Sequence, residues 1–187
     1  MPTAILEPVL LGIGLAMDAF AVSIALGAAG QRDFTWPKIA AAAGSFGAFQ
    51  MFMPILGWGG GTLFGETLLA WGHYIAPALL LGIGLNMIRE TVKSAPDEAP
   101  SPGFGAMRLF VLSLATSIDA LAVGVSYACR PNVTIVTDAA IIGVVTALIS
   151  ACGGIAGRRC GRLFGGKCGI FGAAILIGIA VKVFFFG

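Results

Sequence analysis

Charged side chains are the scarcest feature of this 187-residue sequence. They make up 11% of it, whereas hydrophobic residues make up 58% and the mean hydropathy is +0.96. An average soluble domain carries about 25% charged residues, so this composition excludes an ordinary soluble protein. The net charge is only +2, which gives no support to a nucleic-acid partner. The composition is that of an integral membrane protein.

Cysteine is also scarce, with four residues and no C-x-x-C pair among them. Free cysteines in a membrane protein are typically small buried apolar residues, so we interpret these four as packing residues. The sequence also lacks a basic region ahead of its first apolar run. We therefore expect no cleaved signal peptide.

Six apolar stretches are long enough to cross a bilayer as helices, which takes about 20 mostly apolar residues. They are residues 4–29, 38–63, 68–88, 108–128, 133–157 and 168–186. The longest connection, residues 93–107, is rich in proline and glycine and is typical of a flexible linker. We predict an all-α integral membrane protein with six transmembrane helices in the lipid bilayer.

Basic residues are concentrated in alternate connections. Only Arg130 lies in the other connections, and Lys182 lies inside the last stretch. The remaining basic residues are Arg32, Lys38, Arg89, Lys93, Arg108, Arg158, Arg159, Arg162 and Lys167. By the positive-inside rule their connections are cytoplasmic, which predicts that both termini lie outside the cytoplasm.

The sequence repeats itself when Asp18 is aligned with Asp119, because "MDAFAV" then aligns with "IDALAV". The alignment continues by pairing Gln50 with Ser150, Gly57 with Gly157 and Gly61 with Gly161. Each half contains three stretches, and an odd number forces the halves to cross the membrane in opposite directions. We predict two inverted-topology three-helix repeats, residues 1–92 and 108–187, joined by a cytoplasmic linker at 93–107. The alternative is chance similarity between small apolar residues.

Asp18 and Asp119 are the acids of this repeated motif. Inverted symmetry would bring both to the membrane midplane, on the seam between the halves. A carboxylate there costs roughly 2.5–3.5 kcal/mol on insertion scales and usually marks an ion or proton path. The alternative is that each acid is a structural acceptor for a neighbouring hydroxyl, such as Thr116 or Ser117.

Two carboxylates at one buried site repel each other unless one is protonated or a cation lies between them. A divalent cation satisfies both charges, and oxygen ligands suit hard ions such as Mg²⁺, Ca²⁺ and Mn²⁺. Gln50 offers its side-chain amide and also its main-chain oxygen, because Pro54 has no N–H to bind that oxygen. Alternatively, the freed carbonyl accepts a neighbour's hydroxyl. Asn86, late in the third stretch, is a further candidate ligand through its amide oxygen.

Lys182 has two interpretations. Its ammonium group could neutralise an acid of the empty site and couple transport to charge movement. Alternatively, it extends to the membrane interface near the end of the chain.

The chain resembles the MntP family of bacterial manganese efflux pumps, six-span proteins related to the LysE-type exporters. The resemblance covers essentially the whole chain and is most specific in "MDAFAVSIALGA" (17–28), "MPILGWGGG" (53–61), "SIDALAVGVS" (117–126) and "LIGIAVKV" (176–183). It implies export of Mn²⁺ from the cytoplasm across the bacterial inner membrane, with Asp18 and Asp119 as the essential carboxylates. It implies no prosthetic group.

Three functions are compatible with two membrane acids. We favour a divalent-cation exporter with Mn²⁺ as its cargo. The alternative is a LysE-type exporter of an amino acid or another small cationic solute, for which the dense small residues leave little room. An intramembrane aspartyl protease would carry a G-x-G-D element, whereas here the acids follow "LAM" and "TSI". We therefore predict that the protein is not an enzyme.

Overall fold

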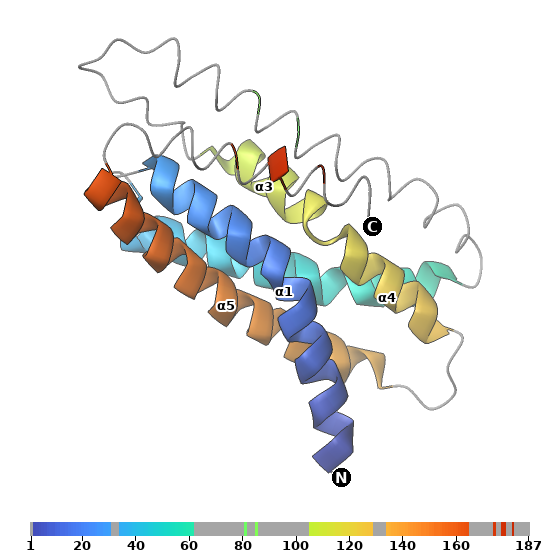
Figure 1. The fold of residues 1–187 in the computed structure, drawn as a ribbon. Helices are drawn as coiled ribbons and strands as arrows, with labels where there is room; N and C mark the ends of the chain where they lie inside the picture. The colour runs from blue at the N-terminus through green and yellow to red at the C-terminus, as the bar shows by residue number, and fades with distance from the viewer. Residues whose placement is uncertain are drawn as a thin grey trace.

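The computed structural model describes residues 2–30, 34–61, 105–128 and 134–164, with residues 81, 85, 174, 177, 178 and 181. The regular elements in these ranges are all α-helices, without a strand, as predicted. The labelled helices are α1 (Pro2–Gly30), α3 (Ala106–Ala115), α4 (Ile118–Ala128) and α5 (Ile135–Phe164) (Figure 1). A further helix, Trp36–Gly61, carries no label in Figure 1 and is called the second helix below.

Three of these helices are long and apolar enough to cross a membrane. Their apolar segments are Ile5–Ala28, Trp36–Gly61 and Ile135–Cys160. The pair α3 and α4 meets the same criteria as one broken span, bent by 42°. The described helices therefore supply three spans, or four with the bent pair. The stretches predicted at 68–88 and 168–186 fall almost entirely outside the described residues.

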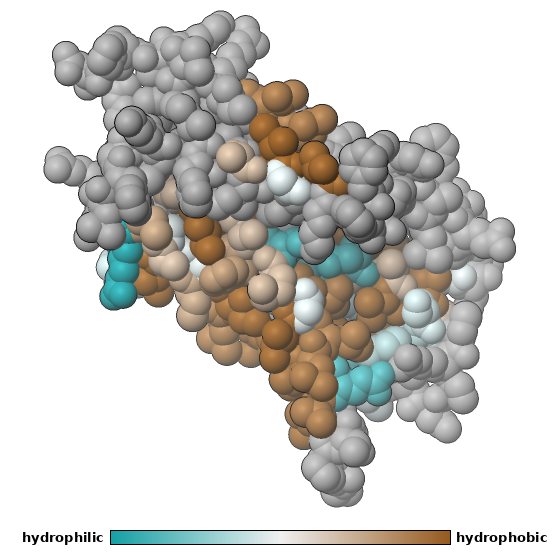
Figure 2. Space-filling model, viewed as in Figure 1, coloured by the Kyte–Doolittle hydropathy of each residue, from teal (hydrophilic) through white to brown (hydrophobic). Residues whose placement is uncertain are grey.

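The outer surface of the described helices is suited to lipid. Figure 2 shows apolar residues over most of the described part of the visible face. Large apolar side chains such as Leu10, Phe52 and Leu148 are more than half exposed. Such a surface would be unfavourable in water but is the ordinary lipid-facing side of a membrane helix.

Helix α1 packs against α5 through glycines that let the two backbones approach. A Cβ atom on Gly27 would lie 2.7 Å from the Gly154 oxygen, and one on Gly153 would lie 2.6 Å from the Phe20 oxygen. Gly12, nearer the start of α1, meets Ile142 near the start of α5. The contacts advance along both helices together, so α1 and α5 run in the same direction (Figure 1).

The second helix crosses α5 at a pair of glycines that face each other. A Cβ atom on Gly47 would lie 2.7 Å from the Gly143 oxygen, and one on Gly143 would lie 2.8 Å from the Gly47 oxygen. The next contacts are also reciprocal, because Ala147 lies against Gly47 and Met51 lies against Gly143. Gly47 and Met51 precede Gly143 and Ala147 by the same number of residues. The second helix and α5 therefore meet through equivalent positions.

The same separation relates the other glycine contacts of these two helices. Gly57 of the second helix meets Leu121 of α4, just as Gly153 of α5 meets Phe20 of α1. Gly61 and Gly157 likewise meet Val125 and Ile24. The contacts thus pair Gly57 with Gly153, so the sequence alignment that paired Gly57 with Gly157 is wrong by about one helical turn. Small apolar residues match at several registers, and only the contacts distinguish them.

Gly57 should tolerate no side chain, because a Cβ atom there would overlap the Leu121 carbonyl of α4. We expect Gly57→Ala to lower the free energy of unfolding by about 1–3 kcal/mol, as overpacking does. Gly59→Ala is the matched control, since a Cβ atom there has nothing within 4 Å. Thermal unfolding of the purified proteins in detergent measures the difference. A Gly57→Ala protein that melts at or above the Gly59→Ala temperature would show that this contact is not tight.

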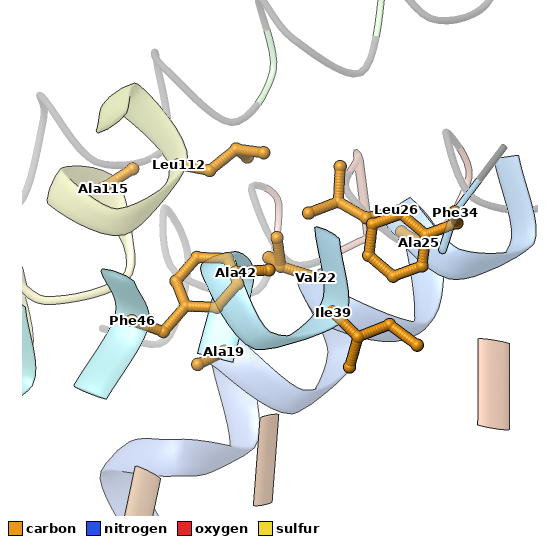
Figure 3. Packing of buried hydrophobic residues seen from close by; sticks show 10 residues of the cluster. All are labelled: Ala19, Val22, Ala25, Leu26, Phe34, Ile39, Ala42, Phe46, Leu112 and Ala115. Carbon is orange, nitrogen blue, oxygen red and sulfur yellow. The ribbon is translucent and has the colours of Figure 1, made fainter. Parts of the chain in front are cut away.

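A buried apolar cluster joins α1, the start of the second helix and α3 (Figure 3). Val22 and Leu26 of α1 lie beside Phe46 of the second helix and Leu112 of α3. Its full membership is Ala19, Val22, Ala25, Leu26, Phe34, Ile39, Ala42, Phe46, Leu112 and Ala115. The cluster fills the space between the C-terminal half of α1 and α3.

Candidate functional site

Gln50 lies in the middle of the second helix and is completely buried. Its side-chain nitrogen Nε2 donates hydrogen bonds to the Thr116 oxygen at 3.0 Å and to the Leu15 oxygen at 3.3 Å. These two acceptors fix the orientation of the amide, because its oxygen would be repelled by two carbonyls. The oxygen Oε1 is buried and has no hydrogen-bond partner within the described ranges. A buried acceptor in this condition costs about 1–3 kcal/mol unless a donor or a cation reaches it.

The break between α3 and α4 supplies one of these carbonyls. Ser117 donates its hydroxyl to the Ser113 oxygen at 2.6 Å, while its backbone N–H turns to the Leu114 oxygen at 3.2 Å. The hydroxyl thereby replaces the backbone donor that an unbroken helix would give to Ser113. In an unbroken helix the Ala120 N–H would donate to Thr116, but here it lies 2.8 Å from Asp119 Oδ1. The Thr116 oxygen is thus available to Gln50.

Asp18 and Asp119 each lie three residues after a carbonyl that Gln50 binds. Three residues of helix advance by about 4.5 Å, so each acid begins about one turn from the Gln50 amide. Both acids are half-buried. Asp119 also lies in the first turn of α4, where the helix dipole favours a carboxylate. The structure thus brings Gln50 against the backbone just before both predicted acids.

The hydroxyls of Thr116 and Ser117 do not donate to Asp119. Thr116 donates to the Leu112 and Ser113 oxygens at 3.0 and 3.3 Å, and Ser117 donates to Ser113. Each hydroxyl has a single proton, so none remains for the carboxylate. The interpretation of Asp119 as an acceptor for these two neighbours is wrong, and the two hydroxyls shape the helix break instead.

Pro54 lies inside the second helix and is buried. Its carbonyl faces α4 closely enough that a Cβ atom on Gly124 would overlap it. Proline has no N–H, so it cannot bind the main-chain oxygen of Gln50. That oxygen as a cation ligand stays a prediction.

A pocket of about 690 Å³ opens between the N-terminal half of α1 and α4. Its lining is mainly apolar, and Glu7, Ser126 and Tyr127 contribute the polar groups. The lining residues are Leu6, Glu7, Leu10, Leu11, Gly14, Leu15, Val123, Ser126 and Tyr127. Leu15, which lines the pocket, also supplies one of the backbone oxygens that accept from Gln50.

The pocket faces of both helices continue to the two acids. On α1, Leu11 and Gly14 line the pocket, and Asp18 follows them at the spacing of one helical face. On α4, Val123 and Ser126 line the pocket, and Asp119 precedes them on the same face. The helical faces that line the pocket therefore continue to the positions of the two carboxylates, although neither carboxylate lines the pocket itself.

Three more buried oxygens were missed by sequence reasoning as site candidates. The hydroxyls of Ser23 on α1 and of Thr146 and Ser150 on α5 are buried, and no described residue hydrogen-bonds them. Thr146 follows Gln50 by the same number of residues as Gly143 follows Gly47, so Thr146 is the counterpart of Gln50 on α5. For Thr146 and Ser150 the signal in the sequence is a pair of hydroxyl residues one turn apart in an apolar segment of α5.

Asn86 and Lys182 lie outside the described residues, as does most of the linker at 93–107. Within the part of the chain that the structure describes, no three His, Cys, Asp or Glu side chains come together as a metal site. A cation held by the described residues would therefore depend on at most two carboxylates together with neutral oxygens.

Comparison with protein families matches residues 33–184 to the Mntp family, described as "Putative manganese efflux pump". The chain belongs to this family. The resemblance to the MntP family that the motifs indicated is confirmed.

Relatives in the MntP family are similar over nearly their whole length. "Putative manganese efflux pump MntP" of Methanosphaera stadtmanae is 42% identical over 182 residues, covering 95% of this chain and 97% of that protein. "Probable manganese efflux pump MntP" of Escherichia coli O1:K1 / APEC is 40% identical over 180 residues, covering 94% and 93%. No solved structure matches the chain.

MntP family membership and the apolar helices together make this a multi-pass membrane protein. The names of the relatives describe transporters and not enzymes.

Proposed function

We propose that this protein exports a divalent cation, foremost Mn²⁺, from the cytoplasm. The cation binds at the membrane midplane to Asp18 and Asp119, with Gln50 Oε1 as a neutral oxygen ligand and Asn86 as a further one. The observation that carries the proposal is the Gln50 amide. Its nitrogen bridges the two chain segments that lead to the acids, and its buried oxygen is left without a donor.

The chemistry of this donor set suits a hard divalent cation. Carboxylate and amide oxygens are the ligands that Mg²⁺, Ca²⁺ and Mn²⁺ prefer, and the two negative charges balance one such ion. The relatives are named as manganese efflux pumps, which favours Mn²⁺ among these ions. Lys182, whose ammonium group could neutralise an acid of the empty site, is the proposed charge-coupling residue.

The proposed architecture is six spans in two inverted repeats, residues 1–92 and 108–187, joined by the linker 93–107. Reciprocal contacts between Gly47 and Gly143 support it, because helices related by a twofold axis meet through equivalent residues. The parallel course of α1 and α5 supports it too, since the first and fifth of six spans cross in the same direction.

The proposed location is the inner membrane, with the basic connections in the cytoplasm and both termini outside. The pocket between α1 and α4 lies towards the N-terminal end of α1. In this orientation the pocket opens to the outside and is the release path of an exporter.

Proteoliposomes that contain the purified protein and a trapped Mn²⁺ sensor test the proposed function. We expect Mn²⁺ to enter at a rate well above that of protein-free vesicles, because the direction of a downhill flux follows the imposed gradient. Labelled lysine should not enter, since two acids and neutral oxygens form a site for a small ion. Lysine uptake without Mn²⁺ uptake would favour the LysE-type alternative instead.

A further inference from the structure

The pocket between α1 and α4 has counterparts in the opposite half of the molecule. Asp18 and Asp119 are a fixed number of residues apart in the sequence. The same number of residues separates each pocket residue from a counterpart on α1, on α3 or at the end of α3. In this way Val123, Ser126, Tyr127, Leu11, Gly14 and Leu15 correspond to Val22, Ala25, Leu26, Leu112, Ala115 and Thr116. All six of these counterparts are buried, with exposed fractions of 0–7%. The other three pocket residues, Leu6, Glu7 and Leu10, correspond to Met107, Arg108 and Val111 nearer the start of α3, which are not buried.

The six buried counterparts are packed, whereas the pocket residues enclose space. All of them except Thr116 belong to the buried cluster of Figure 3, where Phe34 and Phe46 pack against them. Six equivalent positions therefore line a pocket at one end of the molecule and are packed at the other.

Two contacts hold the closed end and have no equivalent at the open end. The Ser45 and Ser113 hydroxyls are hydrogen-bonded at 2.8 Å. The Phe49 and Phe110 rings meet edge to face, with centroids 5.4 Å apart. Both contacts join the second helix to α3. The separation that pairs Gly47 with Gly143 relates Ser45 to Ile141 and Phe49 to Val145. The separation that pairs Asp18 with Asp119 relates Ser113 to Gly12 and Phe110 to Val9. These counterparts can form neither a hydroxyl hydrogen bond nor a ring contact.

We propose that this structure is the outward-open state and that the closed end is an inner gate. The inner gate consists of Val22, Leu26 and Leu112, held by the Ser45–Ser113 and Phe49–Phe110 contacts. When it opens, the counterparts of the pocket residues line a second vestibule, through which a hydrated divalent cation reaches the acids from the cytoplasm. The outer pocket closes in the same transition. The direction of the gate rests on the proposed export function and orientation.

The break between α3 and α4 can act as the hinge about which α3 moves. The Ser117 hydroxyl already replaces the backbone donor to the Ser113 oxygen, and the two helices are bent there by 42°. The corresponding residues of α1 are Leu15 and Ala16, and α1 is a continuous helix there. Opening of the inner gate is thus a rotation of α3 about the break, while α1 stays fixed against α5.

Cysteine labelling of Val22 and Val123 tests the inner gate directly. The two valines are equivalent positions, but Val22 is fully buried and Val123 lines the pocket. Val22→Cys and Val123→Cys are introduced separately into the full chain with its four native cysteines replaced by alanine. A polar maleimide is added in detergent without metal, so both ends of the protein are accessible. If the inward-open state is populated at about 0.1–10%, Val22→Cys should react about 10–1,000-fold more slowly than Val123→Cys.

Removing the two contacts should reduce this difference. Ser113→Ala combined with Phe110→Leu weakens only the closed end, so Val22→Cys should react faster and Val123→Cys more slowly. Equal labelling rates in the starting proteins, or rates that both stay unchanged after these substitutions, would overturn the inner gate.

A disulfide provides a second measurement that needs no substitution in the buried cluster. Ser45→Cys with Ser113→Cys places two thiols where hydroxyls already lie 2.8 Å apart. Diamide, as the two-electron oxidant, should link them and stop Mn²⁺ flux, and reduction should restore it. Normal flux through the oxidised, fully cross-linked protein would overturn the gate. Unequal labelling without flux of Mn²⁺ would instead keep the gate and overturn the proposed export.

Discussion

Asp18→Asn and Asp119→Asn should each abolish Mn²⁺ transport while the protein stays folded. Asparagine keeps the shape of the side chain but removes one of the two charges that balance a divalent cation. Removing one partner of a buried charge pair costs about 2–5 kcal/mol. Mn²⁺ affinity should therefore fall by at least roughly 30-fold, because each 1.4 kcal/mol is a factor of ten. Calorimetric titration of Mn²⁺ and flux in proteoliposomes measure the two effects.

At Asp119, two substitutions distinguish the effect of the charge on transport from the effect of the side chain on folding. Its Oδ1 accepts the Ala120 N–H in the first turn of α4, and the amide oxygen of Asp119→Asn can do the same. Asp119→Ala has no such acceptor and should also lower the unfolding temperature. Asp97→Asn, in the linker, is the control for loss of a carboxylate elsewhere. Transport at the control rate in either Asp18→Asn or Asp119→Asn would exclude a two-carboxylate site.

The membrane-spanning helices could be predicted because their signal is local. Ile5–Ala28 and Ile135–Cys160 are long, predominantly apolar runs, and hydropathy identifies such runs directly. The stretch 108–128 gave the same signal and was predicted as one helix, but the structure divides it at Thr116 and Ser117. Hydropathy does not register this break, because the competition between hydroxyl and backbone donors causes it. The corresponding Leu15 and Ala16 carry no hydroxyl.

The sequence singles out the two acids and Gln50 as candidates, but it does not indicate how Gln50 is held. An amide inside an apolar helix is conspicuous in a sequence, whereas the partners of its nitrogen depend on helix packing. Leu15 and Thr116 contribute only backbone oxygens, and no sequence pattern identifies which carbonyls a distant side chain will reach. For the same reason Thr146, the counterpart of Gln50 on α5, was not recognised.

Gln50→Leu should weaken Mn²⁺ binding and also destabilise the protein, because the amide has two separate functions. Loss of Oε1 removes a proposed ligand, for which we expect a decrease in affinity of about 10–100-fold, as for other residues that support metal sites. Loss of Nε2 leaves the buried Thr116 carbonyl without its donor, at a cost of about 1–3 kcal/mol in the free energy of unfolding. Phe52→Leu, on the lipid-facing side of the same helix, is the control for both measurements.

Gln50→Glu distinguishes the two functions of the amide. In the empty site the new carboxyl group should stay protonated, because only its protonated form has an O–H that can donate to one of the two carbonyls of Thr116 and Leu15. Mn²⁺ favours the deprotonated form, so each ion bound should release a proton from this group. The affinity of Gln50→Glu should therefore rise with pH more steeply than that of the unsubstituted protein. Calorimetry in two buffers of different ionisation enthalpy counts the extra proton. If Gln50→Glu releases no more protons than the unsubstituted protein and Gln50→Leu binds Mn²⁺ with unchanged affinity, Gln50 does not contact the cation.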